Sequence, residues 1–179
     1  MTRLKERYNN EVVPKLKKDL GRENPWALPR LEKVVINMGV GKALENRKRL
    51  EAAAKDLAAI TGQKPVLTKA RTSISAFKLR EGQEIGCKVT LRGSRMYEFL
   101  DRLINVAIPR IKDFRGLPVK GFDSHGNYTM GMGDQFVFPE IVPDQVEFPQ
   151  GMNITVVFKN GQKGASHRLL EHLGMPFQR

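Results

Sequence analysis

The sequence predicts an α+β protein: a single domain with a mostly antiparallel β-sheet, helices packed on one face, and a polar, basic face left open. Short segments that alternate apolar and polar residues are separated by longer segments whose apolar residues have helical spacing. Two of the helical segments lie between predicted strands, which favours a sheet covered by helices on one side. The outward strand positions are rich in Lys, Arg, Asn and Thr, and the formal net charge is +12.

Apolar periodicity predicts the helices. The first is a basic N-terminal helix with Pro14 as an interruption. In the second, Asn46 is a plausible N-cap and Gly62 a stop signal. Pro109 marks the end of the third, and Gly174 ends the last. The predicted helices are residues 2–20, 46–61, 95–108 and 163–173.

Alternation predicts the strands and the direction of their side chains. In residues 85–92 the odd positions are apolar, whereas Lys88, Thr90 and Arg92 point outward. The first strand adds Lys33 and Asn37 to this outward set. The predicted strands are residues 31–38, 65–70, 85–92, 135–138 and 152–159.

The outward set carries one sign of charge. A half-exposed antiparallel sheet normally has a polar outer face, but such a face would mix Glu and Asp with Lys. Only Glu32 and Glu84 are acidic in or beside the strands compared, and neither belongs to the outward set. This bias favours a face that contacts RNA or DNA, through phosphate and groove shape, because the outward positions lack a pair of aromatic side chains for base stacking.

Two loops stand out. Residues 71–86 place Arg71, Lys78 and Arg80 among mostly small residues, with one aromatic side chain, Phe77. This segment is either a loose surface loop or a finger extended toward something negative. The glycine-rich residues 112–134 predict a long loop, and long loops in compact domains are usually functional or disordered.

Composition limits the class of protein. A sequence pI of about 10.0 favours polyanionic partners, either nucleic acid or an anionic membrane. The single cysteine excludes an internal disulfide and a Cys-based zinc site, and fits a reducing cytosol. We find no secretory signal and no apolar stretch near the ~18 residues of a membrane span. The basic first helix could lie on a membrane, but Asn9, Asn10 and Pro14 dilute its apolar face. We expect a basic cytoplasmic protein with no membrane partner.

Enzyme interpretations find little support. The "GVGK" turn lacks the glycine and hydroxyl positions of both common nucleotide-binding fingerprints, because Leu44, Ile36 and Ala43 stand there. It is equally a plain turn or a phosphate-cupping one. The histidines lack metal spacing, and Cys87 falls on the apolar face of its strand as a buried small hydrophobe. We predict no catalytic residue, no metal and no cofactor.

Five strings, in order, carry a resemblance over essentially the whole chain: "LAAITGQKPVLTKARTS", "GCKVTLRG", "AIPRIKDFRGL", "GNYTMG" and "FPEI". They resemble the family of the bacterial large-subunit ribosomal protein number five, which binds 5S rRNA. The resemblance implies a structural protein of the central protuberance of the cytoplasmic ribosome. Its implied partners are 5S rRNA, 23S rRNA, peptidyl-site tRNA, a small-subunit head ribosomal protein and other 5S-binding ribosomal proteins.

The resemblance also implies three groups of contact residues. For 5S rRNA they are Lys33, Asn37, Gly39, Gly41, Gln63, Thr68, Lys69, Arg71, Lys88, Thr90 and Arg92. The finger that would reach the tRNA contributes Ser73, Ser75, Phe77, Lys78 and Arg80. The loop of the inter-subunit bridge contributes Arg115, Lys120, His125, Asn127 and Tyr128.

Departures from the family pattern fall in the finger and the bridge loop. Thr72, Ser124-His125 and Gly133 each stand where a more basic residue or pair is common in the family. Two alternatives of other classes stay open on the sequence alone. One is a generic RNA chaperone or nucleic-acid-coating protein, and the other an enzyme that uses the glycine turn.

Overall fold

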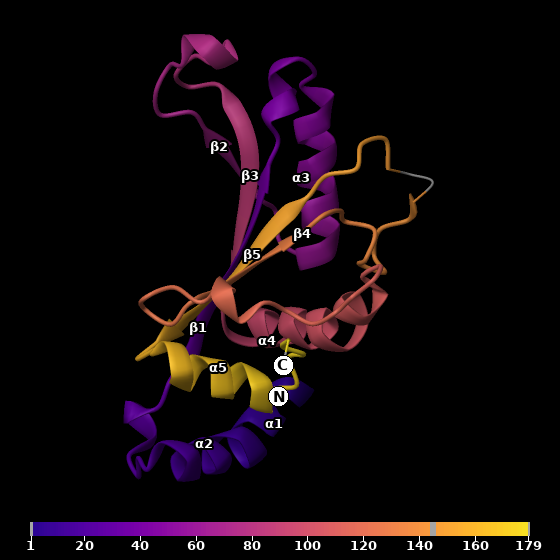
Figure 1. Cartoon of the computed structure of the whole chain (residues 1–179). Helices are drawn as coiled ribbons and strands as arrows, with labels where there is room; N and C mark the ends of the chain where they lie inside the picture. Colours follow the sequence, from indigo (N-terminus) through magenta and orange to yellow (C-terminus); the bar gives the residue numbers. More distant parts are fainter. Residues whose placement is uncertain (1, 144–145, 179) are drawn as a thin grey trace. The chain divides into compact units, whose positions relative to one another are not determined.

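The computed structural model describes residues 2–143 and 146–178 and contains one five-stranded antiparallel sheet (Figure 1). The strand order is β2-β3-β1-β5-β4. The α+β class with a mainly antiparallel sheet is therefore confirmed. The strands are β1 (Arg30–Gly39), β2 (Val66–Lys69), β3 (Glu84–Leu91), β4 (Tyr128–Met132) and β5 (Met152–Lys159).

Helices occupy the predicted stretches. Several of them are extended by π-helical or 3₁₀ turns, among them Tyr8–Val12, Leu103–Ala107 and Ile108–Arg110. The α-helices are α1 (Arg3–Arg7), α2 (Val13–Leu20), α3 (Lys48–Thr61), α4 (Gly93–Arg102) and α5 (Lys163–His172).

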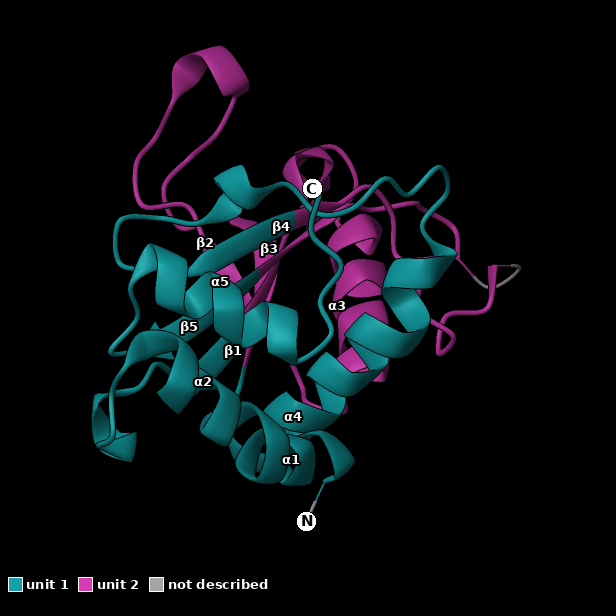
Figure 2. Ribbon diagram, turned by 60° about the horizontal axis from the view of Figure 1, so that its bottom comes forward, with its two compact units in different colours: residues 1–34, 91–130, 155–179 teal, residues 35–90, 131–154 magenta. Residues whose placement is uncertain are grey.

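Two compact units divide the chain (Figure 2). Unit 1 comprises residues 1–34, 91–130 and 155–179, and unit 2 comprises residues 35–90 and 131–154. In unit 1 the helices pack on one another, α1 against α4 and α2 against α5. In unit 2 the single long helix is α3. Whether the whole chain acts as one domain stays a prediction.

The core of unit 2 follows from the two periodicities. Ile36 and Met38 of β1 are fully buried, as are Leu57 and Ile60 of α3. Alternate strand residues share one side of a sheet, and residues three or four apart share one side of a helix, so each element presents an apolar face. Burying one such side chain stabilises the fold by about 1.5–3 kcal/mol.

The ends of α3 match the sequence signals. The Asn46 side-chain oxygen accepts a hydrogen bond from the Lys48 amide at 3.0 Å, so it satisfies one of the free donors at the start of the helix. At the other end, Gly62 adopts the left-handed conformation with φ 65°. The stop at Gly62 is confirmed. Asn46 bonds the start of the helix as expected of a cap, but the N-cap position of α3 is Arg47, one residue later.

Pro14 does not break the first helix. It falls in the first turn of α2, directly after the π-helical turn Tyr8–Val12. The amide of the preceding Val13 donates to the Tyr8 carbonyl oxygen in the π-helical turn, so the chain is helical on both sides of the proline. The wider turn accommodates a residue that has no amide hydrogen to donate. The helical stretch therefore continues to Leu20 with a change of pitch in place of an interruption.

The loop predicted over residues 112–134 is wrong in part, because it contains β4. Tyr128, Met130 and Met132 are buried while Thr129 and Gly131 are exposed, which is the alternation of a strand. The strand predicted at residues 135–138 is also wrong, since these residues form turns. Phe138 is buried there as a single side chain, without strand pairing.

Strand β2 is one edge of the sheet and is only four residues long. It pairs antiparallel with β3, with Val66 opposite Lys88 and Leu67 opposite Cys87. Val66 is 62% exposed and Leu67 37% exposed, so this strand adds little to the core. The loop that connects β2 to β3 extends beyond both strands (Figure 1).

Within residues 2–143 and 146–178, none of the helices has the length and hydropathy needed to cross a membrane.

Candidate nucleic-acid interface

The open face of unit 2 is formed by the outward side chains of β1, β2 and β3. On β3, Cys87 and Val89 are buried, whereas Lys88 is exposed and Thr90 is half-buried. On β1, Asn37 is half-buried between the fully buried Ile36 and Met38. The predicted inward and outward sets of these strands are confirmed.

Strand β2 adds hydroxyl and ammonium groups beside β3. Thr68 lies opposite Gly86, and paired residues of neighbouring strands point to the same side of a sheet. The register shifts between Thr68 and Lys69, which brings Lys69 opposite Glu84. Thr68 therefore joins Lys88 on the open face, and the shift sets Lys69 at the sheet edge.

Three glycines leave one end of the open face without side chains. The packing of the chain requires one of them and not the other two. A Cβ atom on Gly86 would lie 2.8 Å from the Met38 carbonyl oxygen and 2.8 Å from Thr68 Oγ1, so the packing of this chain requires glycine there. A Cβ on Gly39 or Gly41 would meet nothing within 4 Å, and neither residue has a positive φ. Nothing within the chain requires glycine at these two positions, and its absence of a side chain leaves the backbone open to a partner.

A hydrogen-bond network centred on the buried Gln135 holds the Gly39 turn in place. Gln150 Nε2 donates to the Gly39 carbonyl oxygen at 2.9 Å. The backbone N–H of Gln150 donates to Gln135 Oε1 at 2.6 Å, and Gln135 is fully buried. Gln135 Nε2 donates to Asp56 Oδ2 and to the Phe148 carbonyl oxygen, both at 3.1 Å.

This network was not predicted from the sequence. The only signal for it was one polar residue beside an apolar run, Gln135 before Phe136–Val137–Phe138, and that run was interpreted as a strand. The network ties the turn to helix α3 through Asp56, so it positions the exposed backbone without touching a partner itself.

Gln63 is held at the other end of the face. The buried Thr61 hydroxyl donates to the Leu57 carbonyl oxygen at 2.7 Å and accepts from the Gln63 amide at 3.3 Å. Gln63 Nε2 reaches the Thr90 carbonyl oxygen at 3.5 Å. The turn after α3 thus fixes Gln63 against β3.

Three cations of the open face have no acidic partner in the part of the chain that the structure describes. Among the described residues, no carboxylate lies within 4.0 Å of the charged groups of Lys69, Arg71 or Lys88, although Glu84 does pair with Arg47 at 3.7 Å. Unpaired exposed cations on one face raise the local positive potential, which attracts polyanions.

Two further predicted residues belong to unit 1. Lys33 is half-buried, with its ammonium 3.9 Å from Glu32 Oε1, so its charge is partly offset. Arg92 is exposed in extended backbone immediately before α4. By alternation both point to the outward side of their strands.

The finger, residues 71–86, has its own hydrogen-bonded structure. Ile74 and Leu79 form an isolated antiparallel bridge with bonds of 2.9 and 3.1 Å, closed by the 3₁₀ turn Ser75–Phe77. The Ser73 hydroxyl accepts from the Glu81 amide at 2.9 Å, so this predicted contact residue also braces the loop.

The side chains at the finger tip are displayed to solvent. Residues 71–78 are all exposed, and Phe77 is 70% exposed. Arg80 is exposed as well, and Lys78 adopts a positive φ of 52°. Phe77 and Lys78 border an open hollow of about 490 Å³ that they share with Lys42 and Leu44 of the glycine turn.

The predicted bridge residues divide into exposed and structural ones. Arg115, Lys120 and His125 are exposed. The side chain of Asn127 is used inside the loop: its Nδ2 donates to Asp123 Oδ2 at 2.8 Å, and its Oδ1 accepts from the Phe158 amide at 3.1 Å. The hydrogen bonds that Asp123 accepts, first of all the one from the Asn127 side chain, hold its pKa below the ordinary value.

Tyr128 must be corrected as a surface contact. Its side chain is fully buried, its hydroxyl donates to the Pro118 carbonyl oxygen at 3.2 Å, and its ring centroid lies 4.6 Å from that of Phe122. Burial raises the pKa of Tyr128 to about 12. The residue orders the loop from inside unit 1 and presents no side chain to a partner.

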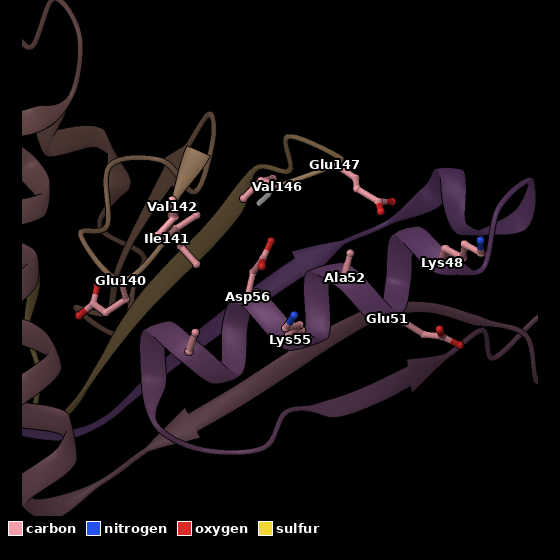
Figure 3. Close-up of a pocket in the computed structure, with 11 residues that line it drawn as sticks. Lys48, Glu51, Ala52, Lys55, Asp56, Glu140, Ile141, Val142, Val146 and Glu147 are labelled. Atoms are coloured by element: carbon pink, nitrogen blue, oxygen red, sulfur yellow. The ribbon is translucent and has the colours of Figure 1, made fainter. Parts of the chain in front are cut away.

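A separate hollow of about 370 Å³ lies along α3 in unit 2 (Figure 3). Carboxylates outnumber lysines in its lining, so its charge does not suit a polyanion. In the described part of the chain, no group of three or more His, Cys, Asp and Glu side chains has the geometry of a metal site. The charged lining residues are Lys48, Glu51, Lys55, Asp56, Glu140 and Glu147.

Cys87 is buried, as predicted, and burial raises the pKa of its thiol from 9.0 to about 11. We expect a thiol reagent such as DTNB at pH 8 to react with the folded protein at least about 100-fold more slowly than with the urea-unfolded protein, because a thiolate attacks and two pKa units remove most of it. A time course at 412 nm measures both rates. Equal rates would show that Cys87 is accessible.

A sheet face with unpaired cations, an uncovered glycine backbone and no aromatic stacking residues is typical of proteins that bind structured nucleic acid through its backbone. Comparisons with known proteins agree with this class. Residues 24–80 match the family described as ribosomal protein L5, and residues 84–177 match the C-terminus of the same ribosomal family.

Curated relatives match along their whole length. Proteins named large ribosomal subunit protein uL5 are 54% identical in Geobacter sulfurreducens, with 99% of each chain covered, and 56% identical in Anaeromyxobacter sp. strain Fw109-5, with 98% of each covered. The corresponding protein of Desulfotalea psychrophila is 51% identical, with 100% of each covered. The chain belongs to the ribosomal protein L5 family. It is a structural protein of the large ribosomal subunit, placed on the cytoplasmic ribosome, and not an enzyme.

Proposed function

We propose that the open face of β1, β2 and β3 binds 5S rRNA and helps attach it in the central protuberance of the large subunit. One observation carries the proposal: the same face has cations without a carboxylate partner and two glycines that the packing of the chain does not require. Lys69, Arg71 and Lys88 supply the charge, and Gly39 and Gly41 let a ribose-phosphate backbone approach closely.

Contact to the RNA runs through its backbone and groove. The outward positions of β1 and β3 in unit 2 hold Asn37, Lys88 and Thr90, whose side chains suit phosphate and 2′-hydroxyl groups. Gln63 offers an amide beside Thr90. Because no aromatic side chain lies on these positions, base stacking has no platform on this face.

We infer a second contact for the finger, which would meet peptidyl-site tRNA. Lys78 and Arg80 are exposed cations for phosphates, Ser73 and Ser75 offer hydroxyls, and Phe77 offers an apolar surface. A segment that buries so little within its own chain gains stability by contact outside it.

The same reasoning assigns the exposed Arg115, Lys120 and His125 to an inter-subunit bridge with a small-subunit head protein.

The wider partners follow from membership of the family. A protein of the central protuberance lies beside 23S rRNA and other 5S-binding ribosomal proteins. We propose these as neighbours of the chain, with no residue assigned to either.

The test compares binding of 5S rRNA with binding of an unrelated RNA of equal length across a salt series. We expect 5S rRNA to bind at least tenfold more tightly, about 1.4 kcal/mol. Lys88→Ala and Arg92→Ala should weaken 5S binding and reduce the salt slope by about 0.7–0.9 each, since each removes one phosphate contact. The finger double variant Lys78→Ala/Arg80→Ala should leave 5S binding unchanged.

Lys55→Ala is the matched control, because it removes one exposed lysine from α3 without touching the open face. If all variants weaken both RNAs equally, including Lys55→Ala, the protein is a general polyanion binder of the chaperone or coating type. If only the finger variant loses 5S rRNA, the two surfaces have been assigned the wrong way round.

A further inference from the structure

Trp26 is the one tryptophan of the chain and the most exposed large apolar side chain among the described residues, at 73% exposure. The chain becomes buried two residues further on: Leu28 is 2% exposed and Pro29 is buried as well. The segment is therefore anchored while its largest side chain contributes almost nothing to the core. Such a residue is a common anchor of intermolecular contacts.

The backbone of Trp26 is fixed from both sides. Asn24 Oδ1 accepts a hydrogen bond from the Trp26 amide at 2.9 Å, and Asn160 Nδ2 donates to the Trp26 carbonyl oxygen at 2.7 Å. Pro25 begins the 3₁₀ turn Pro25–Ala27 and restricts its dihedral angles. The backbone that carries the indole is thus fixed before any partner binds, which lowers the entropy cost of binding.

An arginine lies on the indole. The Arg30 guanidinium is over the ring, with Cζ 5.3 Å from the centroid. A second arginine, Arg22, is anchored to the same segment, since its Nη1 donates to the Ala27 carbonyl oxygen at 3.0 Å and its Nη2 to Gln162 Oε1 at 3.3 Å.

Arg30 and Arg22 each line an open hollow of unit 1. One, of about 480 Å³, is lined by Arg30, Leu31, Glu32 and Lys159, and the other, of about 550 Å³, by Lys17, Lys18, Gly21, Arg22 and Glu23. Cations outnumber carboxylates in both linings taken together. The Glu32 carboxylate also has a lysine, Lys33, 3.9 Å away, so its negative charge is partly offset.

We propose that Trp26, Arg30, Arg22 and Lys159, which we call the Trp26 surface, bind an unpaired stretch of RNA. One base stacks on the indole, and flanking phosphates meet Arg22 and Lys159. Aromatic stacking needs a base that is free of its duplex neighbours, and the surrounding cations select a polyanion over a neutral peptide. The site lies in unit 1 and uses no residue of the open face, so it goes beyond the binding of 5S rRNA proposed above.

The test uses the full chain and its intrinsic fluorescence, because Trp26 is the only tryptophan and reports on itself. The probes are a 12-nucleotide single-stranded RNA of mixed sequence, the 12-base-pair duplex of that sequence, and inorganic polyphosphate. We expect the single strand to quench the emission, while the duplex and polyphosphate leave most of it intact. Trp26→Ala should weaken binding of the fluorescein-labelled single strand about tenfold, and Trp26→Phe should restore most of it.

Three outcomes would overturn the proposal. In the first, polyphosphate or the duplex quenches the emission as strongly as the single strand does. In the second, Trp26→Ala binds the labelled single strand with wild-type affinity, and in the third, phosphatidylserine vesicles or an acidic peptide change the emission and RNA does not. Circular dichroism checks that Trp26→Ala stays folded, which its exposure favours. Lys55→Ala, outside both surfaces, should quench as the wild type does. Binding of 5S rRNA to Trp26→Ala, which should equal that of the wild type, tells failure at the open face from failure at the Trp26 surface.

Discussion

Gly86→Ala is expected to destabilise the fold by about 1–3 kcal/mol, because its new methyl group would meet atoms that cannot all move aside. The Cβ would lie 2.8 Å from Thr68 Oγ1 and 2.8 Å from the Met38 carbonyl oxygen. The hydroxyl can rotate away, but the carbonyl belongs to the backbone of the neighbouring strand. Urea unfolding followed by circular dichroism measures the change.

Gly39→Ala is the matched control, since a Cβ there would meet nothing within 4 Å. We expect it to leave stability unchanged or to raise it by up to about 1 kcal/mol, through the lower entropy of the unfolded chain. The same variant should weaken 5S rRNA binding if the RNA backbone approaches this glycine. A loss of stability in Gly39→Ala equal to that in Gly86→Ala would refute the distinction between the two positions.

Gln135→Leu is expected to have the other large effect, a loss of about 3 kcal/mol, because it removes the centre of a buried hydrogen-bond network. The substitution leaves the Gln150 amide and the Phe148 carbonyl without the partners they have now, and Asp56 loses its amide donor. For a chain of this size the melting temperature should fall by about 6–12 °C. Differential scanning calorimetry provides the measurement.

Gln150→Ala is the comparison for this prediction. Gln150 is half-buried, and its side chain makes the single bond to the Gly39 carbonyl, so we expect a smaller loss of stability. Both variants should weaken RNA binding, since each glutamine helps to hold the Gly39 turn. If Gln135→Leu melts at the wild-type temperature, the network contributes no net stability.

Strands with clean alternation could be predicted closely from the sequence. The prediction for residues 152–159 coincides with β5, and those for residues 31–38 and 85–92 differ from β1 and β3 by one residue at either end. In these strands most inward residues are apolar and most outward residues polar, so local pattern and burial agree.

Strand β4 was missed because its outward positions hold Thr129 and Gly131, and glycine is typical of turns. A Cβ on Gly131 would lie 3.4 Å from Asn153 Oδ1 of the neighbouring strand, an ordinary contact distance, so the packing does not require glycine there. The run Phe136–Val137–Phe138 has the composition of a strand, but the adjoining Gln135 is occupied by the buried amide network.

The candidate site shows the same division. The outward direction of Lys88 and Thr90 follows from strand periodicity alone, and the structure places them as expected. The burial of Tyr128 depends on Phe122 and Phe177, and Phe177 is nearly fifty residues away in the chain. Distant packing of that kind leaves no local signal, so a family motif can mark a residue without saying whether it faces a partner or the core.

The exposed edge at β2 has a consequence for the protein before it joins the ribosome. An edge strand presents unpaired amides and carbonyls that can template another chain, and exposed Val66 and Leu67 would favour such self-association. The edge is protected against it by its length of four residues, by Pro65 directly before it, by Lys64 before the strand and by Lys69 at its end. The positive charge of these lysines makes newly synthesised copies repel one another.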